Sequence, residues 1–168
     1  SWIGDAVIYN VFVDRFYDGD TSNNDYCAEA ASGYCDNNHA VHGQLPAHPQ
    51  DDYRFTYNGG DLDGVVDRLD YLEDLGINVL WLSPVFDNPN FYTDTDFNSN
   101  NDIYFTYHGY HPSDPLSVEE VFGTQNDLQT LVTQAANRDI RVILDFVPNH
   151  TSSQHSNFIS ASITCAGP

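Results

Sequence analysis

The sequence predicts an α/β fold with a parallel sheet, and its three strands and two helices fit a partial (β/α)8 barrel as well as a doubly wound sheet. Three observations lead to this prediction. Apolar runs of strand length recur along the chain, helical patterns separate the runs, and the residues with the most chemical content follow the ends of the runs. Buried strands that alternate with amphipathic helices form βαβ units, whose strands lie parallel in one sheet.

The predicted strands are continuous apolar runs, as expected for strands that are covered on both faces. They cover residues 6–13, 78–83 and 140–146, and the last two are followed by Pro84 and Pro148. A complete barrel needs eight such strands, so this sheet would carry an unpaired apolar edge. The order of elements also fits a doubly wound sheet, and the pattern alone leaves both architectures open.

Two helices are predicted between the strands. The first has apolar residues at helical spacing over residues 65–75, and Gly76 is placed to end it. The second has its apolar face over residues 128–136, and Thr124 followed by Asp127 resembles a capping box. Residues 14–49 and 85–116 are predicted as long loops, and loops of that length are usually functional.

The composition excludes several classes of function. The formal net charge is −20, from 5 Arg plus Lys against 25 Asp plus Glu, which disfavours nucleic acid and anionic membrane surfaces as partners. No apolar run approaches the ~18 residues of a transmembrane helix. The acidity fits either ordinary solubility or adaptation to salt. The sequence starts at Ser1 rather than Met, and we expect a mature extracellular protein.

Three cysteines support an oxidising location. Cys27 and Cys35 lie close together in a polar stretch, at a spacing that suits a small loop closed by a disulfide. We therefore expect these two to pair. Cys165 is the odd cysteine, and we expect it to remain free or to pair outside this segment.

The first candidate site follows the third predicted strand. Asp145, Asn149 and His150 leave this strand end together, and ligands bind at the carboxyl ends of strands in parallel βα folds. The alternative is a turn-capping carboxylate beside an ordinary surface histidine. The segment from Tyr107 to His111 offers aromatic faces beside imidazoles, which suits a sugar ring, although a tyrosine-rich loop can also simply pack on its own barrel.

The second candidate site follows the first predicted strand. Oxygen-bearing side chains are dense between Asp18 and Asn24, and such short turning loops suit Ca²⁺, which takes six to eight oxygen ligands. Gly59 and Asp61 could complete the shell from the other end of the long loop. The spacing is not that of an EF-hand, and a solvated turn is the alternative.

Five ordered segments together resemble the N-terminal part of a glycoside hydrolase family 13 enzyme, the α-amylase superfamily. They read IYNVFVDRFYDGD, GGDLDGVVDRLDYLEDLGINVLWLSPVF, YHGYHPSDP, FGTQNDLQTLVTQA and VILDFVPNHTS. The resemblance is strongest to cyclodextrin glucanotransferases and cyclomaltodextrinase-like amylases. It implies a (β/α)8 barrel over residues 1–150, with the calcium and disulfide loop at 18–61, and the start of an inserted B domain at 151–168.

The resemblance also assigns roles to particular residues. It implies that Tyr110 stacks on the sugar, that His108 and His150 bond it, and that Asp145 holds the site together. It makes Asn149 a ligand of one calcium, and it gives a second calcium site these ligands: Asp18, Asp20, Asn23, Asn24, Gly59 and Asp61. His111 departs from the aromatic residue that many amylases have at this position, which puts the neighbouring sugar contact in doubt.

The expected function is that of a segment of a retaining α-glucan-active enzyme that hydrolyses or transglycosylates α-1,4-glucosidic bonds. In the family the catalytic Asp, Glu and Asp come from later strands, so we expect no catalytic residue in this chain and no activity from it alone. The expected partners are an α-glucan and the remainder of the same barrel. The alternative is a non-catalytic, calcium-dependent glucan-binding module.

Overall fold

The centre of the computed structural model is a three-stranded parallel sheet in the order β1-β2-β7. The structure describes residues 2–24, 57–89, 91–94 and 102–165. The sheet strands are β1 (Ile8–Val11), β2 (Val79–Leu82) and β7 (Arg141–Leu144), and each lies inside a predicted apolar run. The prediction of three parallel strands is therefore confirmed.

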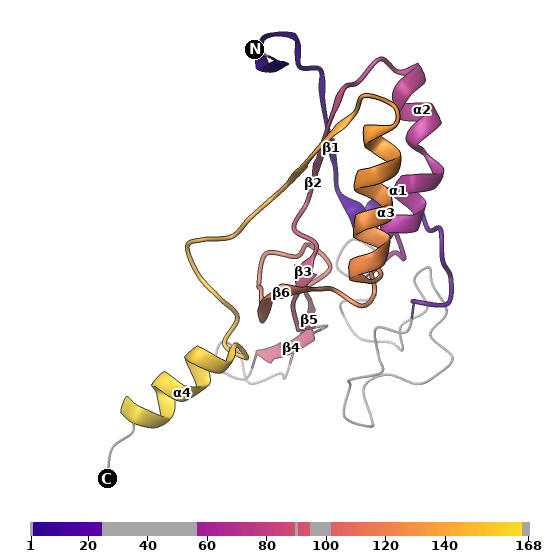
Figure 1. Cartoon of the computed structure of the whole chain (residues 1–168). Helices are drawn as coiled ribbons and strands as arrows, with labels where there is room; N and C mark the ends of the chain where they lie inside the picture. Colours follow the sequence, from indigo (N-terminus) through magenta and orange to yellow (C-terminus); the bar gives the residue numbers. More distant parts are fainter. Residues whose placement is uncertain (1, 25–56, 90, 95–101, 166–168) are drawn as a thin grey trace.

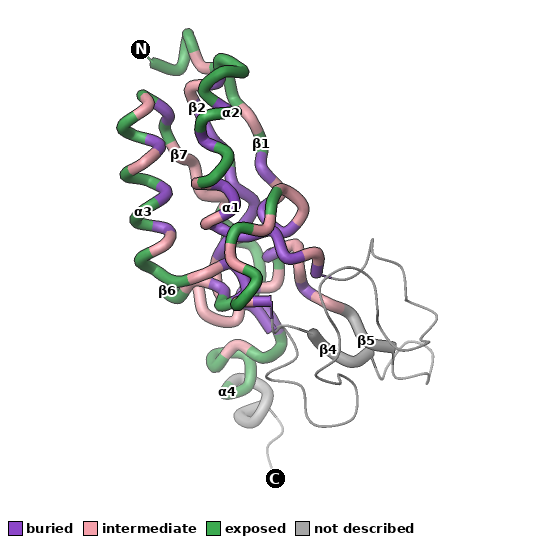
Figure 2. Tube along the Cα trace, turned by 90° about the vertical axis from the view of Figure 1, so that its right-hand side faces the viewer, coloured by how far each residue is buried: buried purple, intermediate pink, exposed green. Residues whose placement is uncertain are grey.

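The helices that connect these strands lie on one side of the sheet (Figure 1). They are α1 (Leu62–Asp67), α2 (Leu69–Asp74) and α3 (Gln125–Ala136). Between them and the sheet lies the core, in which the helix residues Leu62, Leu69 and Leu131 and the strand residues Leu80 and Leu82 are fully buried. Figure 2 shows this buried layer running between the strands and the inner sides of the helices. Neighbouring units in the wall of a barrel have this arrangement.

The strand register explains which side chains enter that core. Tyr9, Leu80 and Val142 share one row across the sheet and belong to the core on the helix side. The next row on the opposite face contains Asn10, Trp81 and Ile143. Successive side chains of a strand alternate between the two faces, so this second row points away from the helices. Trp81 is indeed exposed.

The first predicted helix is wrong as a single element, because the helix breaks at Arg68. The backbone N–H of Arg68 donates to the carbonyls of Val65 and Val66, which tightens the turn and ends α1. The Arg68 guanidinium lies 3.7 Å from the centre of the Tyr17 ring. The second predicted helix is confirmed as α3, and Thr124 and Asp127 form the reciprocal capping box that begins it.

The connection between β2 and α3 contains short strands where the sequence predicted only a loop. Strand β3 (Phe86–Asp87) pairs with β6 (Asp114–Val118), and β4 (Phe91–Asp94) pairs with β5 (Asp102–Phe105), both in antiparallel fashion. Such short strands carry no recognisable alternation, so the sequence pattern cannot show them.

Three further elements complete the described chain. Short 3-10 helices flank β1 at η1 (Trp2–Asp5) and η2 (Val13–Arg15), and α4 (Ser156–Cys165) extends away from the sheet (Figure 1). Among the described residues, no helix has the length and apolar character needed to cross a membrane.

Candidate substrate site at the carboxyl ends of the strands

The structure brings the four predicted substrate-binding residues together. Asp145 directly follows β7, and its Oδ2 accepts a hydrogen bond of 2.7 Å from the hydroxyl of Tyr110. This bond joins two segments that are 35 residues apart in sequence. Burial of the ring, and secondly this hydrogen bond, raise the pKa of Tyr110 to about 12. The Tyr110 side chain is thus fixed at the point where the strand ends.

His150 holds the backbone of the same tyrosine. Its Nε2 lies 2.8 Å from the carbonyl oxygen of Tyr110, and because a carbonyl only accepts, Nε2 must carry the proton. The amide Nδ2 of Asn149 lies 3.3 Å from His150 Nδ1 and can donate to it. The Nε2 proton is therefore already donated to the Tyr110 carbonyl in this conformation. His150 could donate it to a sugar hydroxyl only if the sugar displaced this hydrogen bond.

His108 is held as a neutral donor. The backbone N–H of Tyr110 donates to His108 Nδ1 at 3.0 Å, so that nitrogen is an acceptor. Burial, and secondly the neighbouring His111, lower the pKa of His108 to about 4. The two rings of His108 and Tyr110 lie nearly parallel, with centroids 5.9 Å apart. At neutral pH, His108 therefore presents a neutral imidazole whose proton is on Nε2.

His111 is a part of the site that the residue pattern did not assign. Its ring centroid lies 5.0 Å from that of His108 and 6.0 Å from that of His150. Burial, and secondly the neighbouring His150, lower the pKa of His111. The sequence showed His111 only as a departure from an aromatic position, because nothing in the order of residues indicates that it lies between two other imidazoles.

Gly109 allows the segment to turn between His108 and Tyr110. Its φ is +75°, and a Cβ at this position would overlap the carbonyl oxygen of Pro84, which follows β2. The glycine thus lets the sugar-facing segment lie directly against the end of a neighbouring strand.

Replacing Gly109 by alanine is expected to displace Tyr110 and to reduce stability. Gly76→Ala is the matched control, because Gly76 has a similar φ of +83° but nothing within 4 Å of the added Cβ. The control should show only the backbone strain of about 1 kcal/mol. Urea unfolding of both variants measures the difference, and equal losses would mean that the Pro84 contact is unimportant.

The predicted calcium loop is organised around Asp61. One of its carboxylate oxygens accepts from the N–H groups of Gly19 (3.0 Å) and Gly64 (2.6 Å). The other accepts from the Asp20 N–H (2.8 Å) and the Asn23 amide (3.2 Å). Asp61 is also the N-cap of α1. It therefore ties the loop after β1 to the start of this helix.

Three oxygens in the same loop have no hydrogen-bond partner although they are buried. They belong to Asp18 (Oδ1), Asn23 (Oδ1) and Asn24 (Oδ1). The other carboxylate oxygen of Asp18 accepts from the Asn24 amide at 3.0 Å, so these side chains lie together. Buried acceptors without donors are costly unless a cation satisfies them. The oxygen set of the loop therefore fits calcium, although the carboxylate of Asp61 is engaged with N–H donors and that of Asp20 with Ser22.

The remaining predicted site residues have separate locations. Asn149 lies beside His150 at the exposed end of the β7 connection, and Gly59 precedes α1 with φ of +83°. Cys27 and Cys35, the predicted disulfide, lie outside the described residues.

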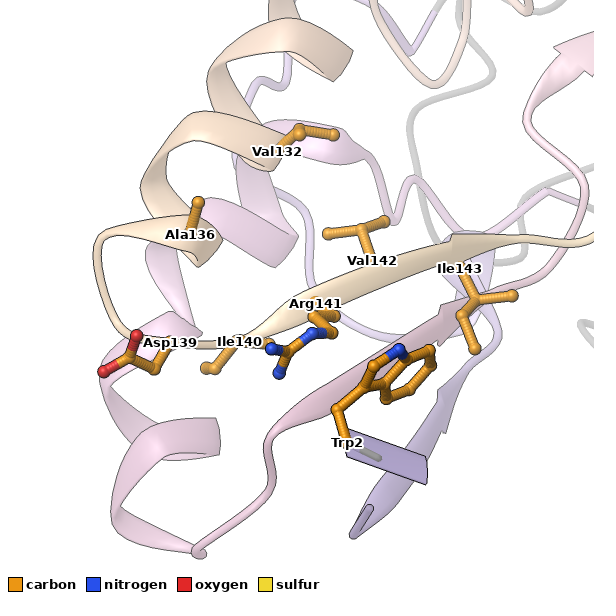
Figure 3. Close-up of a pocket in the computed structure, with 8 residues that line it drawn as sticks. All are labelled: Trp2, Val132, Ala136, Asp139, Ile140, Arg141, Val142 and Ile143. Atoms are coloured by element: carbon orange, nitrogen blue, oxygen red, sulfur yellow. The ribbon is translucent and has the colours of Figure 1, made fainter. Parts of the chain in front are cut away.

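A pocket of about 460 Å³ lies elsewhere, along the free edge of β7 (Figure 3). Val132 and Ala136 of α3 line one side, and Trp2 lies against Arg141, whose guanidinium is 5.2 Å from the indole ring. The pocket is mostly apolar, with Asp139 and Arg141 also in its lining, and it lies beside the strand, away from Tyr110 and Asp145. It exposes the sheet edge rather than the candidate substrate site.

Comparison with known proteins agrees with this geometry. Residues 10–164 match the family described as alpha amylase, catalytic domain. The chain is 32% identical over 165 residues to alpha-amylase 2 of Dictyoglomus thermophilum, covering 95% of this chain and 21% of that protein.

Solved structures give the same picture. An Anoxybacillus alpha-amylase is 34% identical with a TM-score of 0.69, over 96% of this chain and 28% of that one. A cyclomaltodextrin glucanotransferase with a three-domain ABC distribution is 39% identical with a TM-score of 0.64, over 88% and 26%. The chain thus spans between 21% and 28% of the length of these three relatives. The match to the family over nearly its whole length, together with the parallel sheet and the residues at its carboxyl edge, shows that this chain belongs to the α-amylase catalytic-domain family, with the fold of a partial (β/α)8 barrel.

Proposed function

We propose that this chain supplies the substrate-holding part of a retaining enzyme that hydrolyses or transglycosylates α-1,4-glucosidic bonds. The observation that carries the proposal is the convergence of Tyr110, Asp145, His150 and His108 at the carboxyl end of β7. An aromatic ring stacks on the apolar face of a sugar, and neutral imidazoles bond its hydroxyls. In this role Tyr110 is the stacking surface and His108 is the donor.

The nucleophile and the acid/base of the proposed enzyme come from later strands of the whole protein. A retaining glycosidase needs two carboxyl groups about 5–5.5 Å apart on opposite sides of one bond. Asp145 is the carboxylate bonded to Tyr110, and it serves in this proposal to orient the ring. Asp145 is therefore a positioning residue rather than a nucleophile.

The anomeric form of the first product tests the proposed reaction. The full-length protein is mixed with maltoheptaose, and proton NMR spectra are recorded before mutarotation. The proposal expects the α-anomer to appear first. An initial β-anomer would mean inversion, and the absence of any product from any α-1,4-glucan would favour a binding module instead.

The proposal includes calcium in the loop between Asp18 and Asp61. The buried oxygens of Asp18, Asn23 and Asn24 would hold the ion, which would neutralise the Asp18 carboxylate and fix the loop. A second calcium would use Asn149, and this part rests on the family resemblance alone. In both places the ion would act on structure, because neither loop position contacts Tyr110.

Calcium is expected to stabilise the full-length protein, because a ligand that binds only the folded state adds free energy of unfolding, about 2.7 kcal/mol at a concentration of 100 Kd. Asp18→Ala should lose the part of this increase that the loop contributes. Asp67→Asn on the exposed end of α1 is the control with one charge removed. Thermal unfolding in EDTA and in millimolar calcium measures both, and a calcium response in Asp18→Ala equal to that of the control would exclude the loop.

The proposed partner within the protein is the remainder of the barrel. Two features support it: the apolar side chains Trp81 and Ile143 on the face away from the helices, and the pocket along the β7 edge (Figure 3). The proposal assigns residues 1–150 to the barrel and residues 151–168 to the start of the inserted domain. Helix α4, which lies away from the sheet, supports the second assignment (Figure 1). An extracellular location and a disulfide between Cys27 and Cys35 belong to the same proposal.

A further inference from the structure

A group of three carboxylates lies in the connection between β2 and α3, apart from both sites described above. Asp87, Glu119 and Glu120 each bring one oxygen within 4.8 Å of the others. The pairing of β3 with β6 brings them together, and the Glu119 N–H donates to the carbonyl of Val85 at 3.0 Å. Asp87 is held in place by the hydroxyl of Ser113, which donates to its Oδ2 at 2.8 Å.

A second observation is that two buried acceptors beside this group have no hydrogen-bond partner. Glu119 is 0% exposed and Asn88 is 2% exposed, yet Glu119 Oε1 and Asn88 Oδ1 have no hydrogen-bond partner. Both donors of Asn88, its N–H at 2.8 Å and its amide nitrogen, go to the other oxygen of Glu119. The Asn88 amide therefore lies against the Glu119 carboxylate, and each group keeps one oxygen without a hydrogen-bond donor.

We infer that Asp87, Glu119, Glu120 and the amide oxygen of Asn88 bind a divalent cation of the calcium and magnesium class. All the ligands are oxygens, which hard cations prefer over the softer transition metals. A sugar cannot reach the fully buried Glu119, so the group does not serve as a catalytic pair.

The position of this cation site suggests what the ion does. Val85 and Glu119 lie at the two ends of the segment 85–119, which contains Tyr110. The backbone hydrogen bond between them joins these two ends. A bound cation would join Asp87 on one end to Glu119 and Glu120 on the other. It would therefore hold the two ends of the segment 85–119 together without touching the substrate.

Anomalous diffraction from crystals of the full-length wild-type protein soaked in Mn²⁺ locates the ion directly. The inference expects a peak between Asp87, Glu119 and Asn88, separate from any peak in the loop of Asp18. No peak at Asp87, in crystals where the soak is otherwise complete, would overturn it. This measurement needs no variant, so it decides the question even if substitutions impair folding.

Equilibrium dialysis with Ca²⁺ provides the matched test in solution. Glu119→Gln keeps the side-chain volume but removes the charge, and it is expected to weaken binding at this site about 100-fold, as for loss of groups that position a metal. Asp114→Asn is the control, since Asp114 lies near enough to raise the pKa of Asp87 but is not in the ligand group. Bound calcium in Glu119→Gln equal to that of the wild type and the control would contradict the site.

Discussion

Residues 1–168 produced alone are expected to release no reducing sugar from soluble starch, even with millimolar calcium present. Cleavage requires a nucleophile and a proton donor fixed on opposite sides of one bond, and much of the acceleration comes from their orientation. The proposed chemistry places this pair in later strands. The apolar sheet edge along β7 also favours aggregation when nothing covers it.

The assay needs two arms to be informative. In the first, the isolated segment is compared with the full-length protein. In the second, it is mixed with a separately produced C-terminal piece. Turnover only on mixing would identify the segment as the substrate-holding portion of a split barrel. Turnover by the segment alone would overturn the proposal. Binding of maltodextrin by the full-length protein without any turnover would favour the glucan-binding module.

The second large effect is expected in the full-length enzyme when Tyr110 is replaced by alanine. Loss of the ring removes about 1.5–3 kcal/mol of apolar contact, so kcat/KM should fall about tenfold to a hundredfold. Tyr110→Phe keeps the ring and removes only the bond to Asp145, worth about 1 kcal/mol, so its loss should be smaller.

Tyr71→Ala is the control for this series. Tyr71 is an exposed tyrosine on α2, at 52% against 40% for Tyr110, and it lies on the helix layer rather than at the strand ends. It should leave the kinetic constants for maltoheptaose unchanged. Wild-type kinetics in Tyr110→Ala would place this residue outside the substrate site.

The strands of this fold could be predicted because buried parallel strands are continuous apolar runs, and each run contained its strand. The break at Arg68 could not, because the apolar spacing of residues 65–75 continues through it. Strand β3 has two residues, which is too few for any periodicity to be read. The local pattern was therefore enough to predict the parallel sheet and α3, but not the break at Arg68 or the short antiparallel strands.

The candidate site follows the same division. Asp145 and His150 could be expected together because strands of a parallel sheet deliver their following residues to one edge. The bond from the Tyr110 hydroxyl to Asp145, which fixes the ring, is a matter of geometry that no spacing reveals. The proximity of Asp87 and Glu119 could not be predicted from the sequence at all. These two residues are 32 positions apart, and only the pairing of β3 with β6 brings them together.

The contacts around Asp61 have a consequence for how the chain tolerates changes of length. The Asp61 carboxylate accepts hydrogen bonds from the N–H groups of Gly19 and Asp20, and the Asn58 N–H donates to Asp14 at 2.9 Å. These bonds join the two ends of one long segment to each other. Closing a loop of twice the length costs only about 0.6 kcal/mol more when its ends are already fixed. A change in the length of chain between these joined ends is therefore expected to cost little and to leave the residues around Tyr110 in place.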